Sequence, residues 1–279
     1  MKRKPTLAVT RNDTLKTTPG AVRAISAAAK KLGIALVGEK EAARADAILV
    51  LGGDGSMLRA VRAHAALRKP FLGVNIGSIG YLAATPLEGA EEALRAWRDG
   101  ETTVDERSML RAQIRRGGNG RAGAPALALN DLVALREGTG RVACLSLSID
   151  GCDVAQLRCD GLLLATPTGS TAYSLSAGGP ILLPRTEAFV VNVICPHTLS
   201  SRPLVVPAGS VVTASVVSAE GPLAFCADGA VHGRLRRGDS FTATTAALSV
   251  SLLSLPQADP FEPMRCKLGL NYSTVQKRP

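Results

Sequence analysis

The sequence predicts an α/β N-terminal domain with an open, mostly parallel sheet, followed by a β-rich, β-sandwich-like C-terminal domain. Up to about Gly100, short apolar runs alternate with segments of helical periodicity, which is typical of sheets whose strands are connected by helices. From Glu101 onward long helical patterns are absent and strand-like patterns prevail. We therefore expect residues 1–104, with a C-terminal tail of about 259–279, to form the first domain, and residues 105–258 to form the second.

In the first domain each element follows from local patterning. Residues 47–51 are apolar throughout, as parallel strands buried on both faces tend to be. An alanine-rich helix opens after Pro19-Gly20 and ends at Gly33, a residue suited to a helix C-terminus. The predicted strands are 7–10, 34–37, 47–51 and 71–74 and the predicted helices are 21–32, 56–67 and 86–97, an order that indicates a Rossmann-like domain.

The second domain is predicted mainly from alternation. Leu145, Leu147 and Ile149 alternate with serines, which is the pattern of a strand with one buried face. The tail after Asp259 contains prolines and is expected to be irregular and to pack back on the first domain. Further strands are predicted at 108–115, 190–194, 211–217 and 247–255, with a glycine-rich loop at 117–123.

Composition restricts the class of ligand. The 279 residues include 46% hydrophobic but only 3% aromatic residues, so we expect a core of Ala, Val, Leu and Ile. The formal net charge of +10 is spread along the chain without a basic helix, which favours small anionic ligands over nucleic acid.

The six cysteines include no Cys-x-x-Cys pair, so we expect free thiols and no zinc site. Because the sequence shows no secretory signal and no membrane-spanning run, we expect a cytoplasmic protein.

Residues 160–180 combine an apolar run with many hydroxyls and glycines. Asp160-Gly161 leads into residues 162–165, a run short enough for a buried strand. After Pro167 the hydroxyls and glycines suit a polar ligand that lies close to the backbone. Ser170 or Thr171 is expected to cap a short helix there. The alternative is a Gly/Ser-rich loop without a ligand.

Gly52-Gly53-Asp54-Gly55 lies between a predicted strand and a predicted helix, where ligands bind in open parallel sheets. Its glycines permit close approach of a phosphate, and the helix N-terminus that follows attracts anions. The motif matches neither standard nucleotide fingerprint. Asp54 is suited to act as a general base on a hydroxyl or to help hold Mg²⁺ between phosphates, and both roles indicate phosphoryl transfer. The alternative is a simple turn aspartate.

Asn130-Asp131 and Asp160 are further polar groups at predicted strand ends. A paired amide and carboxylate can bind vicinal ribose hydroxyls or the edge of an adenine. Taken alone, each residue is equally well explained as a turn or a cap. Their joint occurrence with the two segments above is what indicates a nucleotide site.

Together these motifs resemble the NAD kinase family. The resemblance rests on residues 51–60, Asn130-Asp131, residues 160–180 and residues 195–203 (Cys-Pro-His-Thr-Leu-Ser-Ser-Arg-Pro), which occur in the family's order and cover about 47–233. The Gly-Gly-Asp-Gly element is shared with diacylglycerol, sphingosine and phosphofructo-kinases. The elements at 166–180 and 196–200 are specific.

The resemblance implies that ATP, or inorganic polyphosphate, donates a terminal phosphoryl group to the 2′-hydroxyl of the adenosine ribose of NAD, giving NADP. It also implies Mg²⁺ or another divalent metal, held mainly by phosphates with no protein ligand assigned. A homodimer or homotetramer formed through the β-rich domain is expected on the same basis.

The resemblance also implies roles for individual residues. Asp54 matches the catalytic aspartate, and Gly52, Gly53, Gly55 and Arg59 form the phosphate or ATP loop. Tyr81 replaces the usual Phe, Asp131 replaces the usual Glu, and Ala230 stands where the family has Gln. The NAD-binding positions implied are Asp54, Gly55, Tyr81, Asn130, Asp131, Arg141, Arg158, Asp160, Thr171, Ala172, Tyr173, Ser174 and Ser176.

Two other functions fit parts of the sequence. A diacylglycerol-type lipid kinase shares the glycine loop, but it gives no reason for the hydroxyls of residues 171–176. A non-catalytic dinucleotide-binding module predicts NAD binding without NADP formation. The choice between ATP and polyphosphate, and between NAD and NADH, stays open at this point.

Overall fold

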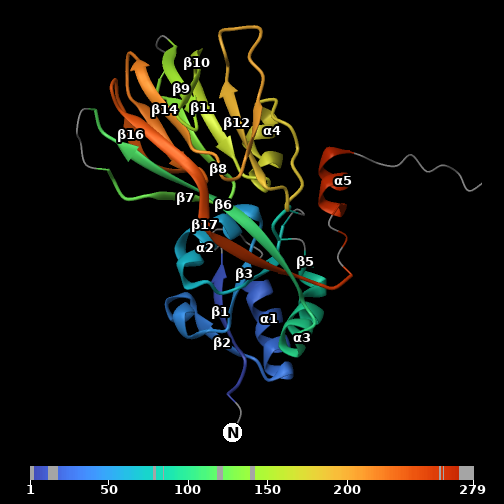
Figure 1. Cartoon of the computed structure of the whole chain (residues 1–279). Coiled ribbons are helices and arrows are strands. Elements are labelled where there is room, and N and C mark those ends of the chain that lie inside the picture. Colours follow the sequence, from blue (N-terminus) through green and yellow to red (C-terminus); the bar gives the residue numbers. More distant parts are fainter. Residues whose placement is uncertain are drawn as a thin grey trace, which may run out of the picture. The chain divides into compact units, whose positions relative to one another are not determined.

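A computed structural model describes residues 3–11, 18–77, 80–83, 85–117, 122–138, 142–257, 259 and 261–269. The chain divides into two compact units (Figure 1). Unit 1 comprises Met1–Glu106 and Val250–Pro279, and unit 2 comprises Arg107–Ser249. Two long strands, β6 (Thr103–Arg115) and β17 (Ser240–Ser254), run from one unit into the other.

Unit 1 is an α/β domain with a parallel sheet in the order β4-β3-β1-β2. The end of β17 adds a further parallel strand beside β4, where Leu252 pairs with Phe71. The elements of unit 1, with η for a 3₁₀ helix, are β1 (Thr6–Arg11), α1 (Thr18–Leu32), β2 (Ala35–Gly38), η1 (Glu39–Arg44), β3 (Ala47–Leu51), α2 (Asp54–His64), η2 (Ala65–Leu67), β4 (Phe71–Asn75), β5 (Thr85–Pro86), η3 (Leu87–Gly89), α3 (Ala90–Asp99) and α5 (Glu262–Leu268).

The core of unit 1 lies between the sheet and helices α1 and α3, which run side by side (Figure 1). Ile25 of α1 and Leu94 of α3 are buried against Leu49 and Leu72 of the sheet. All five residues of β3 are buried, as its continuous apolar run predicts. Aliphatic and alanine side chains dominate this core, which agrees with the aromatic-poor composition.

Unit 2 consists of two layers of β-strands. One is a six-stranded antiparallel sheet in the order β13-β12-β11-β8-β15-β16, and the other contains the run β10-β9-β14-β17 together with β6 and β7. The elements of unit 2 are β7 (Ala126–Ala128), β8 (Asp131–Arg136), β9 (Ala143–Ile149), β10 (Cys152–Cys159), β11 (Gly161–Ala165), η4 (Gly169–Thr171), α4 (Tyr173–Ser176), β12 (Ala188–Ile194), β13 (Leu204–Pro207), β14 (Val212–Ser218), β15 (Leu223–Ala227) and β16 (Ala230–Leu235).

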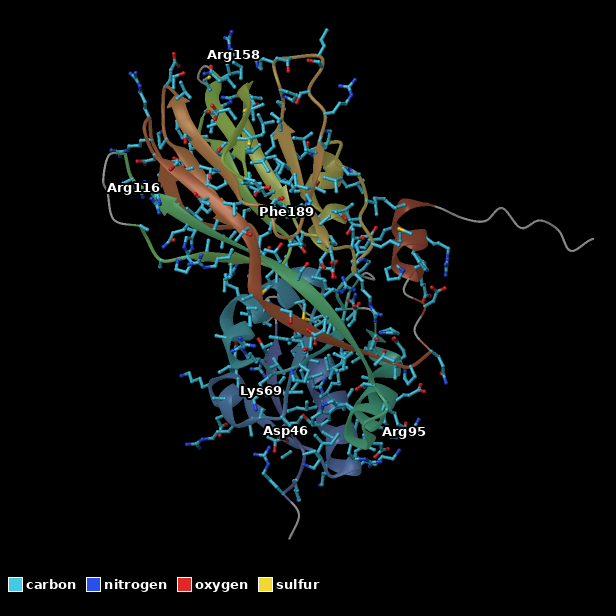
Figure 2. The ribbon with its side chains drawn as sticks, in the orientation of Figure 1. Asp46, Lys69, Arg95, Arg116, Arg158 and Phe189 are labelled. Atoms are coloured by element: carbon cyan, nitrogen blue, oxygen red, sulfur yellow. The ribbon has the colours of Figure 1, made fainter. Side chains whose placement is uncertain are left out.

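A single buried cluster joins the two layers of unit 2. It takes Leu162 and Phe189 from one layer and Leu145 and Phe241 from the other, and Figure 2 labels Phe189. The rings of Phe225 and Phe241 lie 4.9 Å apart between their centroids. This is the packing of a β-sandwich, so the predicted fold class is confirmed for both units.

Three local predictions are corrected. The helix expected at 56–67 begins earlier, at Asp54, and the helix expected at 86–97 begins as the short η3 before α3. The tail was expected to be irregular, but in its described part residues Glu262–Leu268 form α5. Pro263 occupies the first turn of this helix, where its missing N–H costs nothing, and Gly269 ends it in the left-handed conformation. Among the described residues no helix is long and apolar enough to cross a membrane.

Candidate active site

Asp54 occupies the first position of α2, directly after the glycines that follow β3. Its two carboxylate oxygens accept hydrogen bonds from the backbone amides of Tyr81 and Leu82, both at 2.9 Å. The N-terminus of α2 adds a positive dipole at the same place. The carboxylate is therefore fixed in orientation, and each oxygen keeps a lone pair for a ligand proton.

Gly80 allows this arrangement by lacking a side chain. A Cβ atom built there would lie 2.0 Å from Asp54 Oδ1 and 2.6 Å from its Cγ, so any larger residue would displace the carboxylate. Tyr81 follows, and burial and the nearby Asp54 charge raise the pKa of its phenol. Its hydroxyl is buried and has no hydrogen-bond partner among the described residues, so a ligand group can satisfy it.

The backbone of the glycine loop is open. Gly52 has a φ of 155°, and nothing within 4 Å meets a Cβ built on Gly53 or Gly55, so the backbone there is open to a ligand. Arg59, predicted to belong to this loop, instead lies one turn further along α2 and donates to the carbonyl of Arg11 at 2.7 Å. Its guanidinium is exposed and thus remains accessible to an anion.

A cavity of about 860 Å³ lies in unit 1 beside the ends of β1 and β2. Val9, Ile25, Leu36 and Leu51 supply its apolar walls, and Arg11 and His64 are among its polar residues. The sheet order reverses between β1 and β3, and open α/β sheets bind nucleotides at such a point. The volume suits a ligand of nucleotide size.

In unit 2 the backbone of the Asn130-Asp131 pair is held by Asp228, for which the sequence indicated no role. The carboxylate of Asp228 accepts hydrogen bonds from the amides of Leu129 (2.8 Å), Asn130 (2.7 Å) and Asp131 (3.1 Å). Asp228 itself has a φ of 47° in the turn between β15 and β16. This contact fixes the backbone from which the Asn130 and Asp131 side chains project.

Asp131 is 7% exposed, and its pKa is raised to about 7 by burial and by the charge of Asp228. Asn130 has a buried Oδ1 without a hydrogen-bond partner among the described residues. Two adjacent polar side chains, one orphaned and one carrying a perturbed pKa, are typical of a ligand site.

The segment after β11 folds back onto this pair. Thr166 donates its hydroxyl to the carbonyl of Leu129 at 2.5 Å, and its amide donates to the carbonyl of Asn130 at 2.9 Å. Gly169 lies so close that a Cβ built on it would be 2.0 Å from the Asn130 carbonyl oxygen. The glycine is thus required for contact between residues 166–170 and the pair.

The predicted cap by Ser170 or Thr171 is wrong. Residue Ala172 precedes α4, and no side chain caps that helix. The Ser170 hydroxyl is fully buried, donates to the carbonyl of Pro167 at 2.6 Å and accepts from the amide of Leu182 at 2.9 Å. The Thr171 hydroxyl donates to the carbonyl of Thr168 at 3.2 Å. Competition from these local bonds explains why neither hydroxyl reaches α4.

The remaining predicted residues lie in or just before α4 and differ in their exposure to solvent. Ser174 is fully buried, yet its hydroxyl has no hydrogen-bond partner among the described residues, whereas Tyr173 and Ser176 are exposed. Asn192 of β12 holds the helix by donating to the carbonyls of Ser174 (3.2 Å) and Ala177 (3.1 Å). Thr171 and Ala172 precede α4 and are partly exposed.

The structure separates Asp160 from this group. Strands β8 and β11 are antiparallel, with Asp131 opposite Ala165 and Leu135 opposite Gly161, so Asp160 lies at the other end of the strand pair. There it forms an ion pair with Arg136 at 2.6 Å, which lowers the pKa of its carboxyl. Arg158 is exposed near the end of β10 (Figure 2). Arg141 lies outside the described residues.

Comparison with known proteins now assigns the family. Residues 11–102 match the model of the ATP-NAD kinase N-terminal domain, and residues 129–254 match that of the ATP-NAD kinase C-terminal domain. The chain belongs to the NAD kinase family. The NAD kinase of Geotalea daltonii is 38% identical over 81% of this chain and 78% of that protein, and the NAD kinase of Koribacter versatilis is 40% identical over 79% and 76%.

Solved structures agree with the fold. Yeast NADH kinase complexed with NADH has a TM-score of 0.85 at 22% identity, covering 100% of this chain and 91% of that one. An NAD kinase from Archaeoglobus fulgidus in complex with ATP has a TM-score of 0.73 at 25% identity, covering 95% and 97%. The chain is therefore a phosphotransferase of the NAD kinase family, and nothing in these comparisons supports a lipid kinase.

The sequence did not indicate that Asp228, Arg136 and Lys267 would be the partners of the Asn130-Asp131 backbone, of Asp160 and of Asp54. Asp228-Gly229 carries a turn signal, but that signal does not show which amides the carboxylate will bind. Lys267 stands in the tail expected to be irregular, yet its Nζ lies 3.6 Å from Asp54 Oδ2. Only the folded chain brings these groups to their partners.

Among the described residues, no group of three or more His, Cys, Asp or Glu side chains could hold a metal ion. Asp54 supplies carboxylate oxygens beside the glycine loop, and such oxygens would suit Mg²⁺ as one ligand among phosphate oxygens. When bound, Mg²⁺ would neutralise phosphate charge during transfer.

Proposed function

We propose that Asp54 is the general base with which this NAD kinase transfers the terminal phosphoryl group of ATP to the 2′-hydroxyl of the adenosine ribose of NAD. The observation that carries the proposal is the fixed Asp54 carboxylate at the mouth of the glycine loop. Positioning and charge neutralisation dominate phosphoryl transfer, and two backbone amides hold this carboxylate in position.

In the proposed step the ribose 2′-oxygen forms a bond to the terminal phosphorus of ATP as the bond from that phosphorus to the ADP oxygen breaks. The hydroxyl proton passes to Asp54, and the products are NADP and ADP. The open backbone of Gly53 and Gly55, the exposed Arg59 and the N-terminus of α2 are proposed to bind the ATP phosphates. The cavity beside β1 and β2 is proposed for the nucleoside.

NAD is proposed to bind unit 2 through the residues whose polar atoms lack partners. Asn130 Oδ1 and Ser174 Oγ are buried and unsatisfied among the described residues, so a ligand that pairs with them recovers the desolvation cost. Asp131 is shorter by one methylene than the usual Glu, and its buried carboxyl is proposed to contact the nucleotide from closer range. Tyr173 supplies an exposed ring for a base.

The experiment that tests the function is Asp54→Asn. The general-base role predicts that kcat for NADP formation falls by about 10³-fold, because base catalysis contributes roughly 10² to 10⁴. The Kd for NAD should stay within about threefold, since unit 2 is unchanged. Asp46→Asn is a matched control, because Asp46 also accepts a backbone amide of unit 1, that of Thr6 at 2.8 Å. Near-normal turnover in Asp54→Asn would refute the role.

The proposal also covers the divalent metal, the cellular location and the oligomeric state. Divalent metal is proposed to bind mainly through the phosphates. The six free cysteines support a reducing, cytoplasmic location. Asp160 and Arg158 are remote from the Asn130-Asp131 end of unit 2, and we propose that they contact NAD in a homodimer or homotetramer. Light scattering of the purified protein would test the oligomeric state.

A further inference from the structure

Helix α5 is anchored at its first turn by Asp259. The Asp259 carboxylate accepts the amide of Phe261 at 2.9 Å and forms an ion pair with Arg265, which lowers the pKa of the Asp259 carboxyl. The Gly269 amide donates to the carbonyl of Arg265 at the other end. These contacts define the two ends of the short helix, and Lys267 lies in its last turn.

Lys267 contacts two residues of unit 1, Asp54 and Tyr81. Its ammonium lies 3.6 Å from Asp54 Oδ2 and 5.0 Å from the centroid of the Tyr81 ring. The amide of Tyr81 is one of the two that hold Asp54. The C-terminal segment thus places a cation against both the carboxylate and the aromatic ring of the phosphoryl-transfer site.

The ammonium is available to a ligand. A separation of 3.6 Å exceeds the 2.7 to 2.9 Å typical of a charge-assisted hydrogen bond, so the contact with Asp54 is electrostatic. The side chains of Lys267 and Asp54 are 38% and 27% exposed, so solvent reaches both. A lysine ammonium has three donors on a flexible stem, which allows it to bind phosphate without leaving the carboxylate.

A carboxylate beside ATP repels the terminal phosphate, and a nearby cation would reduce this repulsion. Asp54 and the terminal phosphate are both negative, and like charges within a few ångströms repel. Within the described residues, Lys267 is the cationic side chain that an ion-pair contact places at Asp54. A positive charge at this position lowers the repulsion between Asp54 and the terminal phosphate. It leaves the free lone pairs of the Asp54 carboxylate available for the hydroxyl proton.

We propose that Lys267 is a catalytic residue that binds the terminal phosphate of ATP and offsets its repulsion by Asp54. The proposal rests on the function proposed above for Asp54. Lys267 forms no covalent bond in the step. It stabilises the charge on the phosphoryl group while the bond to ADP breaks, the bond to the ribose oxygen forms and the proton moves to Asp54.

The first test compares Lys267→Met and Lys267→Arg with wild type in full-length protein. We expect kcat/KM for ATP to fall by about 10²-fold in Lys267→Met, with partial recovery in Lys267→Arg and an unchanged Kd for NAD. Lys31→Met is the matched control, because Lys31 pairs with Glu91 on α3. A kcat/KM for ATP within threefold of wild type, or an increase, would overturn the proposal.

The second test separates phosphate binding from support of Asp54. Calorimetry measures the Kd of ATP and of AMP for Asp54→Asn and for the Asp54→Asn, Lys267→Met double variant. A direct phosphate contact predicts that the second substitution weakens ATP binding at least tenfold and leaves AMP binding unchanged. Equal ATP affinity in the two variants would show that Lys267 acts only through Asp54 and would overturn the proposal. Normal turnover in Asp54→Asn alone would instead refute the general base.

Discussion

Asp228→Asn tests whether one buried carboxylate organises the Asn130-Asp131 end of unit 2. Asparagine tolerates the positive φ of this position, so the substitution changes the charge and one acceptor without straining the backbone. Asp228 Oδ2 accepts the Leu129 amide and Oδ1 accepts the amides of Asn130 and Asp131. In asparagine only one of those two positions can hold an oxygen.

The cost follows from these bonds. Leaving the amide of Leu129, a fully buried residue, without an acceptor costs about 1–3 kcal/mol. The other two bonds lose their charge assistance at about 1 kcal/mol each. Loss of the Asp228 charge also removes a repulsion on Asp131, which returns part of this energy at alkaline pH. We therefore expect a loss of about 3 kcal/mol in unfolding free energy, larger at pH 5 than at pH 8.

The assay is urea unfolding at both pH values, with hydrogen exchange of the amides at 129–131. Asp150→Asn is the control, because Asp150 also has a positive φ of 52° but accepts one amide, that of Val211, at an exposed turn. It should cost under about 1 kcal/mol. If Asp228→Asn costs no more than this control and leaves exchange unchanged, Asp228 does not organise the site.

Two further predictions concern pH and packing. Because the folded protein holds the Asp131 proton up to about pH 7 and the unfolded chain releases it near its ordinary pKa of 3.8, unfolding free energy should fall as pH rises between these values. From pH 5 to pH 8 this loss amounts to about 2–3 kcal/mol, and Asp131→Asn should abolish it in urea titrations; an unchanged slope would contradict the assignment. Gly80→Ala should displace Asp54 and lower kcat by at least ~10²-fold. Gly89→Ala is the control and should behave as wild type, because its added Cβ would meet nothing closer than 3.6 Å. Equal kcat values for the two variants would show that the backbone at Gly80 adjusts without moving Asp54.

The sequence was most informative where local chemistry and fold agree. The apolar run of β3 and the glycines after it predicted both a buried parallel strand and a ligand loop, since those properties depend on neighbours in sequence. Asp54 was predicted to matter for the same reason. Its two amide partners were not predicted, because Tyr81 and Leu82 reach it only where Gly80, which has no side chain, lets the chain lie against the carboxylate.

Long-range pairing accounts for what could not be predicted. The distance between Asp160 and the Asn130-Asp131 pair is set by the antiparallel register of β8 and β11, and register is not visible in either strand alone. The hydroxyls of residues 170 and 171 suggested a cap, but partners at Pro167, Leu182 and Thr168 compete for them. A short sequence window shows donors and acceptors without showing which of them will meet.

Unit 1 is discontinuous, and this has a consequence for synthesis on the ribosome. The strand end that pairs with β4 and the helix that carries Lys267 are both encoded after the whole of unit 2. Unit 2 is one uninterrupted segment and can fold as soon as it emerges, whereas the first 106 residues must wait for the end of β17 to complete their sheet. A nascent chain therefore cannot complete the Asp54 environment until α5 has been synthesised, and a chain that stops before α5 lacks the contact of Lys267 with Asp54.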